Sequence, residues 1–203
     1  MPPRKERTPE LRARLVNVAV DLLATEGVQA VTTRNVAERA GASAPAIYEL
    51  FTNKSGLVRE LFFEGFARLG SLLEDLPPAS GTVDDVMAFA DAFRTFSIAN
   101  PELFRVMYSR PFSDFAPTRE EAEIGATTRH ALVRRVEVAV DEGVLVGDPI
   151  DMSHAFLALA IGLATQEVDG WLGSDAESRN RRWEMSLRTM LAGCRSLDPE
   201  RTL

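Results

Sequence analysis

The segment TRNVAERAGASAPAIYELFTNK, residues 33–54, constrains the fold most, because it has the residue order of a helix-turn-helix. Gly41 supplies the positive φ that a tight turn between two short helices requires. Ser43 stands where a side chain can cap the second of these helices. The apolar positions expected to face inward are Val36, Ala37, Ala40, Ile47 and Phe51. The segment therefore predicts two short helices packed around a tight turn.

Two residues of this segment are not explained by packing. Helical spacing leaves Tyr48 on the outer side of the second helix. Lys54 follows Asn53, whose residue type commonly caps helices, so a cation and a helix N-terminus lie close together. Such a pair can hold one phosphate group of DNA. The pattern therefore predicts a DNA-binding helix-turn-helix rather than a purely structural scaffold.

The segment resembles the N-terminal domain of the TetR family of transcriptional regulators, and the likeness covers about the first quarter of the chain. The positions that match the family pattern are Thr33, Val36, Ala37, Ala40, Gly41, Ser43, Ile47, Tyr48, Phe51 and Lys54. The resemblance implies a homodimeric repressor that binds a palindromic operator in double-stranded DNA. It also implies that a small-molecule effector of unknown identity releases the protein from the operator.

The expected DNA contacts combine this motif with a basic N-terminal arm. They are Arg4, Lys5, Arg7, Thr33, Arg34, Ser43, Ala44, Pro45, Ala46, Tyr48 and Lys54. The second helix is poor in hydrogen-bond donors. Ala44 and Ala46 can contact thymine methyl groups, and Glu49 can accept a hydrogen bond from cytosine. Direct reading of purines is therefore expected to be limited.

Charge divides the chain unevenly, although its formal net charge is −7. Residues 1–54 carry eight Lys and Arg against six Asp and Glu, whereas the rest carries fifteen against 24. A mildly basic head on an acidic body is compatible with DNA binding, but ordinary scatter of surface charge explains the division almost as well. Hydrophobic residues make up 45% of the chain, which is typical of a packed globular protein.

No membrane segment or secretory leader is expected. The longest apolar run, residues 155–164, is too short to cross a bilayer, and the N-terminal residues contain no apolar stretch of the kind that secretion requires. The cytoplasm is therefore the expected location. The single cysteine, Cys194, cannot form an intrachain disulfide and is expected to be an ordinary packed residue.

Helical periodicity and cap residues predict an all-α chain of about nine helices. A helix-turn-helix DNA-binding domain with the basic arm is expected over residues 1–54, and a helical effector-binding and dimerisation domain over residues 55–203. One long helix, residues 55–76, is expected to connect them. Further helix starts are expected from Thr82 with Asp85, Thr118 with Glu121, Asp148 with Pro149, and Ser174 with Glu177. The helix that begins at Thr118 is expected to continue to Gly143.

The helix expected over about residues 149–172 contains AFLALAIGLAT, which is apolar on every face. A helix of this kind is buried on all sides, either as the central helix of one subunit or with cover from a second subunit. In the family, the last two long helices form a four-helix bundle across a twofold dimer. The resemblance therefore implies that this helix and the one over residues 175–194 form the dimer interface.

Aromatic and sulfur side chains gather in the middle of the second domain. The residues expected to bind an apolar effector are Met87, Phe89, Phe93, Phe96, Phe104, Met107, Tyr108, Phe112, Phe156 and Gln166. Arg94, Tyr108 and Gln166 are the polar groups expected to orient it. Aromatic residues at helical spacing are also typical of an ordinary core, so only the whole group favours a pocket.

Enzymatic and metal-dependent functions find little support in the sequence. His130 and His154 have no His or Cys at metal-ligand spacing, and no phosphate-binding glycine loop or nucleophile motif is present. We therefore expect no metal, no cofactor and no catalytic residue. The alternative to a regulator is a small-molecule-binding or interaction module that has lost operator binding, and an all-α enzyme is the third hypothesis.

Overall fold

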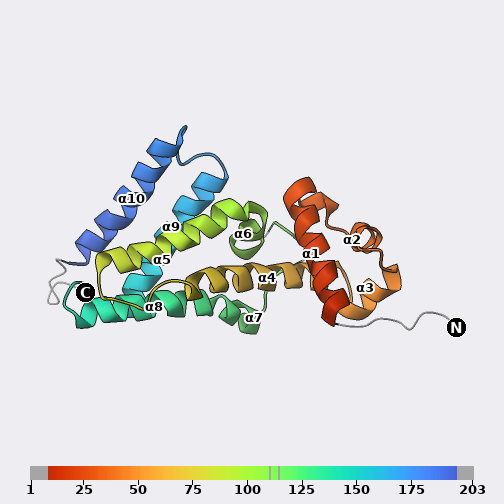
Figure 1. Ribbon diagram of the computed structural model, residues 1–203, viewed down its shortest axis with the longest axis horizontal. Helices are drawn as coiled ribbons and strands as arrows, with labels where there is room; N and C mark the ends of the chain where they lie inside the picture. Colours follow the sequence, from red (N-terminus) through yellow and green to blue (C-terminus); the bar gives the residue numbers. More distant parts are fainter. Residues whose placement is uncertain (1–8, 110, 114, 196–203) are drawn as a thin grey trace. The chain divides into compact units, whose positions relative to one another are not determined.

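The computed structural model describes residues 9–109, 111–113 and 115–195. Within these residues the chain forms ten α-helices, one short 3-10 helix and no strand, which confirms the predicted all-α fold (Figure 1). The helices are α1 (Pro9–Glu26), η1 (Val28–Ala30), α2 (Thr33–Arg39), α3 (Ala44–Phe51), α4 (Lys54–Glu74), α5 (Val83–Ala99), α6 (Pro101–Tyr108), α7 (Arg119–Ile124), α8 (Ala126–Asp141), α9 (Pro149–Val168) and α10 (Ala176–Gly193).

The helices pack into two compact units. The head unit contains the described part of Met1–Ala67 together with Asn100–Glu121, and the body unit contains Arg68–Ala99 together with the described part of Ala122–Leu203. The division between the units falls within α4. These units follow the packing of the chain, whereas the functional boundary expected after Lys54 stays a prediction.

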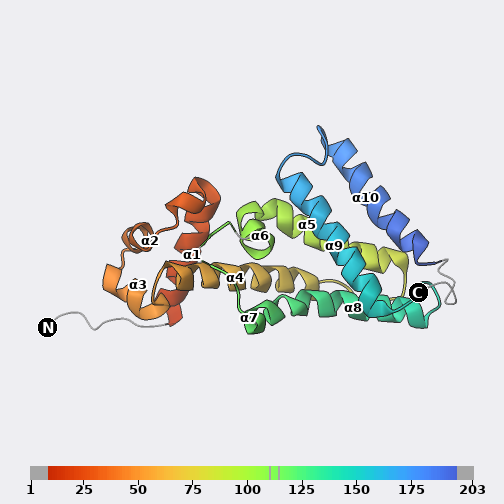
Figure 2. The ribbon, with the colours of Figure 1, turned by 180° about the vertical axis from the view of Figure 1, so that it is seen from behind.

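The core of the head unit is built on α1, which packs against α2 and α6 (Figure 2). Leu15, Leu22 and Leu23 repeat at helical spacing on α1 and are almost completely removed from solvent. Each contributes about 2 kcal/mol by the transfer of its side chain out of water, as an upper estimate. Gly27 then ends the helix with a φ of 80°, a conformation that is strained for any residue with a side chain.

The core of the body unit lies around α5, which packs against α8, α9 and α10. Figure 2 shows α9 crossing beside α5, with α10 next to it. The large side chains that are completely buried in this unit are Phe89, Phe93, Phe96, Phe156 and Trp183. The aromatic residues of α5 therefore fill the centre of the unit.

A buried ion pair joins α8 to the link between α4 and α5. Arg135 of α8 pairs with Asp85 of α5, and both side chains are buried. The second guanidinium nitrogen of Arg135 donates to the carbonyl of Pro77 at 2.8 Å, and Asp85 also accepts from the amide of Ser80 at 3.1 Å. The pair thus fixes both ends of the link within the body unit.

Two expected helix boundaries are wrong. The single helix expected from Thr118 to Gly143 is two helices, α7 and α8, separated at Gly125. Glycine has a low helix propensity, so the break occurs there. The last helix is capped by Asp175 with Ser178 instead of Ser174 with Glu177: Asp175 accepts from the Ser178 amide at 2.7 Å.

Two predicted helix starts are confirmed, and a third expected boundary, the end of α9, is wrong. The Thr118 hydroxyl accepts from the Glu121 amide at 3.2 Å, and Glu121 accepts from the Thr118 amide at 2.8 Å, which completes a reciprocal cap. Asp148 caps α9 by accepting from the Asp151 amide at 2.9 Å. The end of α9 comes a few residues before the expected one, because Gly170 takes a φ of 80° and stops the helix.

Candidate DNA-binding surface and ligand sites

The helix-turn-helix forms where the sequence predicts it. The Thr32 hydroxyl caps α2 by accepting from the Asn35 amide at 3.1 Å. Gly41 makes the turn with a φ of 63°. The inward residues of the motif hold α2 against α3: Val36 and Ala37 of α2, and Ile47 and Phe51 of α3, are all buried. The tight turn and this shared core fix the outer face of α3.

The expected DNA contacts of the helix-turn-helix lie on α2, at the N-cap of α3 and on α3 itself. Tyr48 is 54% exposed, as predicted for a residue that packing does not require. The other expected contacts of this region are Thr33 and Ala46, which are half-buried, and Arg34, Ser43, Ala44 and Pro45, which are exposed. The expected arm residues Arg4, Lys5 and Arg7 lie outside the described residues.

Ser43 differs from the expectation, and Asn35 has a structural role at the start of α2. Ser43 occupies the N-cap position of α3, but its hydroxyl makes no capping hydrogen bond. The Ser43 hydroxyl oxygen therefore does not accept a hydrogen bond from the first backbone amides of α3. The side-chain amide of Asn35 donates to the carbonyl of Ala30 at 3.0 Å, so this side chain supports the start of α2. Arg34, which is exposed beside it, remains the candidate for a phosphate contact.

Lys54 is the first residue of α4, and the preceding residue caps that helix. The Asn53 side chain accepts from the amide of Gly56 at 2.9 Å, which confirms the predicted N-cap. The Lys54 ammonium lies 5.3 Å from the ring centroid of Phe112, in the segment that follows α6. A cation over an aromatic ring is held by electrostatic attraction. A charged group and a helix N-terminus therefore stand together in the head unit.

The segment after α6 makes further contacts with the N-terminal half of α4. The Phe115 ring packs edge-on against Phe62, with 5.7 Å between centroids, and lies under the Arg59 guanidinium. Arg59 also pairs with Glu121. The hydrogen bond from the Thr118 amide, followed by the charge of Arg59, lowers the pKa of Glu121. These contacts connect the segment to the helix that begins with Lys54.

The expected effector residues are divided between the two units. Those of the head unit are Phe104, Met107, Tyr108 and Phe112, and those of the body unit are Met87, Phe89, Phe93, Phe96, Phe156 and Gln166. In the head unit, Phe104 and Tyr108 lie 5.1 Å apart between ring centroids, and burial raises the pKa of Tyr108. All the apolar members are buried except the half-buried Tyr108, whereas Gln166 is exposed.

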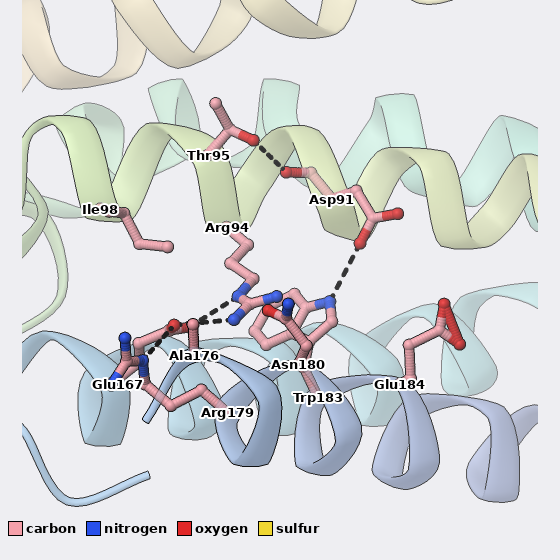
Figure 3. A pocket seen from close by; sticks show the side chains of 10 residues that line it. All are labelled: Asp91, Arg94, Thr95, Ile98, Glu167, Ala176, Arg179, Asn180, Trp183 and Glu184. Carbon is pink, nitrogen blue, oxygen red and sulfur yellow. Dashed lines mark hydrogen bonds and ion pairs between the residues drawn. The ribbon is translucent and has the colours of Figure 1, made fainter. Parts of the chain in front are cut away.

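A different group of residues surrounds an open hollow of about 560 Å³ among α5, α9 and α10 (Figure 3). The Arg94 guanidinium donates to both carboxylate oxygens of Glu167, at 2.6 and 2.7 Å. The same guanidinium lies 5.3 Å from the Trp183 ring centroid, and the Trp183 indole nitrogen donates to Asp91 at 3.1 Å. Arg94 was expected from the sequence to orient an effector, but its partners Glu167 and Trp183 were not expected, because they lie on helices far apart from it in the chain.

The described residues also bear on metal binding, thiol chemistry and membrane insertion. No group of three or more His, Cys, Asp and Glu side chains in the described ranges is arranged to hold a metal ion. Cys194 is buried, and this burial raises the pKa of its thiol. None of the described helices has both the length and the apolar character needed to cross a membrane.

Comparison with known proteins agrees with this geometry. Residues 15–61 match the family described as "Bacterial regulatory proteins, tetR family", and residues 86–190 match "Tetracyclin repressor-like, C-terminal domain". The tetracycline repressor protein class A from transposon 1721 of Escherichia coli is 27% identical over 165 residues, which cover 81% of this chain and 69% of that protein.

Solved structures share the fold. A protein of unknown function from Rhodococcus sp. RHA1 is 25% identical, with a TM-score of 0.76 over 95% of this chain and 100% of its own. A regulatory protein of the tetR family from Rhodococcus RHA1 is 21% identical, with a TM-score of 0.69 over 94% of this chain and 100% of its own. The two family matches together extend from the helix-turn-helix to α10. The chain belongs to the TetR family of DNA-binding transcriptional regulators.

Proposed function

We propose that this regulator is a repressor that binds a palindromic operator as a homodimer and leaves it when a small, mainly apolar effector binds. One observation carries the DNA-binding part of the proposal. While α3 buries Ile47 and Phe51 against α2, it leaves Tyr48, Ala44 and Pro45 exposed. The proposal includes no catalytic activity, and it places the protein with its operator in the cytoplasm.

A second copy of the chain is the proposed partner of α9 and α10. Ala155, Ala158 and Gly162 form an exposed strip of small residues along α9, and a side chain added at Gly162 would meet nothing in this chain. On α10, Met185 is 59% exposed. Small residues let two helices approach closely, and a twofold dimer offers two copies of α3 for the two halves of a palindromic operator.

The effector part of the proposal concerns the buried aromatic residues. Phe93 and Phe89 are completely buried, so an apolar molecule that binds among them must displace side chains. One relative is named a tetracycline repressor, and this name supports a small-molecule effector for the present chain. Phe93→Trp tests the idea: it should mimic or block the effector if the core opens, but should lower the free energy of unfolding by about 1 to 3 kcal/mol if the core is fixed.

The direct experiment selects bound sequences from random DNA and measures their affinity. We expect a palindromic site. Tyr48→Phe should weaken binding to all sequences alike, whereas replacing Ala44 or Ala46 by serine should change which sequence is preferred. If the selection retains no DNA and a thermal-shift screen still finds a ligand, the protein is the alternative, a small-molecule-binding module without an operator.

A further inference from the structure

The hollow among α5, α9 and α10 has the size of a small-molecule site and a distinct charge at each end. At one end, two guanidinium groups share one carboxylate. Arg94 makes the close contacts with Glu167, and the Arg179 nitrogen Nε lies 3.5 Å from the same carboxylate. Because two positive charges face one negative charge, this end retains a net positive charge.

Arg179 has hydrogen-bonding capacity left over. Its other contact with a described residue, from Nη1 to the Gly173 carbonyl, is 3.4 Å long, and its side chain is 32% exposed. A guanidinium has five donors arranged to grip a carboxylate in a bidentate way. A carboxylate that enters the hollow can therefore bind Arg179 while Glu167 stays paired with Arg94.

The other end of the hollow is acidic. Asp91 and Glu184 line it, and both are exposed. One Asp91 oxygen accepts from the Trp183 indole, and the other makes no hydrogen bond with a described residue. Glu184 is already paired with Arg188 at 2.8 Å. The Asp91 carboxylate is thus the group that can receive an ammonium.

The residues between the two ends suit a short peptide. Along α10, the residues that line the positive and the acidic ends, Arg179 and Glu184, are five positions apart, which corresponds to about 7 to 8 Å of helix rise. This rise is similar to the length of an extended dipeptide. The Asn180 amide, which makes no hydrogen bond with other described residues, lies between them and can pair with a peptide group. Ile98, which is 51% exposed, offers an apolar surface at the rim.

We propose that this hollow binds a dipeptide-sized zwitterion, with its carboxylate on Arg179, its ammonium on Asp91 and an apolar side chain at Ile98. The inference goes beyond the proposed function, because it concerns binding at this hollow whether or not DNA is released. It also differs in chemistry from the apolar effector expected among the buried aromatic residues.

The test uses glycyl-leucine as the probe and two blocked analogues as chemical controls. N-acetylglycyl-leucine lacks the ammonium, and glycyl-leucinamide lacks the carboxylate. Binding is measured by calorimetry and by the fluorescence of Trp183, which lies completely buried against the hollow. The background variant Trp171→Phe removes the other tryptophan, which is 81% exposed. We expect glycyl-leucine to bind about tenfold or more tightly than either analogue.

Variants of the full chain test which residue binds each charged group of the probe. Arg179→Gln should lower the affinity for glycyl-leucine about tenfold, to a value close to the affinity of the wild type for glycyl-leucinamide. Asp91→Asn keeps the size of the side chain and should remove the preference over N-acetylglycyl-leucine. Glu177→Gln is on the same helix but outside the hollow, and it should leave the affinity for glycyl-leucine unchanged. Equal binding of all three probes, or no binding at millimolar concentrations to protein with a normal circular dichroism spectrum, overturns the inference.

Discussion

The Lys54 ammonium lies over the Phe112 ring, 5.3 Å from its centroid, although the two residues belong to segments far apart in the chain. Both belong to the head unit. The contact fixes the direction of a side chain that the family motif assigns to DNA. The ring can therefore hold the ammonium in place before a phosphate arrives, which lowers the entropy lost when the contact with DNA forms.

We predict that Lys54→Ala weakens binding to all DNA sequences and reduces the slope of log affinity against log salt by about one per subunit, because one phosphate contact is lost. Phe112→Leu should weaken binding about 2- to 5-fold, the value of a cation–π contact of about 0.5 to 1 kcal/mol, and should leave the slope unchanged. Phe112→Tyr, which keeps the ring, is the matched control. An affinity of Phe112→Leu equal to that of the wild type would show that the ring does not position Lys54.

The dimer interface is tested at the exposed strip of α9. Ala158→Arg should produce a monomer, because a long charged side chain prevents close approach of a second helix. Light scattering at micromolar concentration measures the mass. His130→Arg, which adds charge at an exposed position of α8, should leave the dimer intact. Leu163 is unsuitable as a test position because it is already buried within one chain. A wild-type protein with the mass of a monomer would contradict the proposed dimer.

The buried ion pair of the body unit should be important for stability. We expect Arg135→Ala to lower the free energy of unfolding by about 3 to 5 kcal/mol, because it leaves Asp85 buried without its charged partner. Arg134→Ala, at the exposed neighbouring position, should change it by less than about 0.5 kcal/mol. Urea unfolding measures both values. Similar values for the two variants would contradict a stabilising role for the pair.

Tyr108 should make stability depend on alkaline pH. Burial raises its pKa above that of an unfolded tyrosine, so the folded protein keeps the proton that the unfolded chain begins to lose near pH 10. Its contribution is therefore complete below about pH 10 and declines as the pH rises further. Urea midpoints measured from pH 8 to 11 should fall less steeply in Tyr108→Phe. Identical slopes would mean that Tyr108 does not titrate with unfolding.

Local signals in the sequence were sufficient to predict the helix-turn-helix. The turn at Gly41, the cap at Asn53 and the outward Tyr48 depend on neighbours within a few residues, so the residue order alone predicts them. The same local rules placed one cap at Ser174 instead of Asp175, because adjacent residues of similar capping strength compete and the surrounding packing selects one.

Contacts between distant helices were not predictable in this way. Whether the aromatic residues of α5 are pocket or core depends on how tightly α8, α9 and α10 close around them, and periodicity is the same in both cases. Arg94, Glu167 and Trp183, which line the hollow, belong to three separate helices and come into contact only after packing. The sequence by itself determined the all-α character of the chain and the DNA-binding motif through short-range geometry. Only tertiary packing decided which charged side chains surround the hollow and which ring holds Lys54.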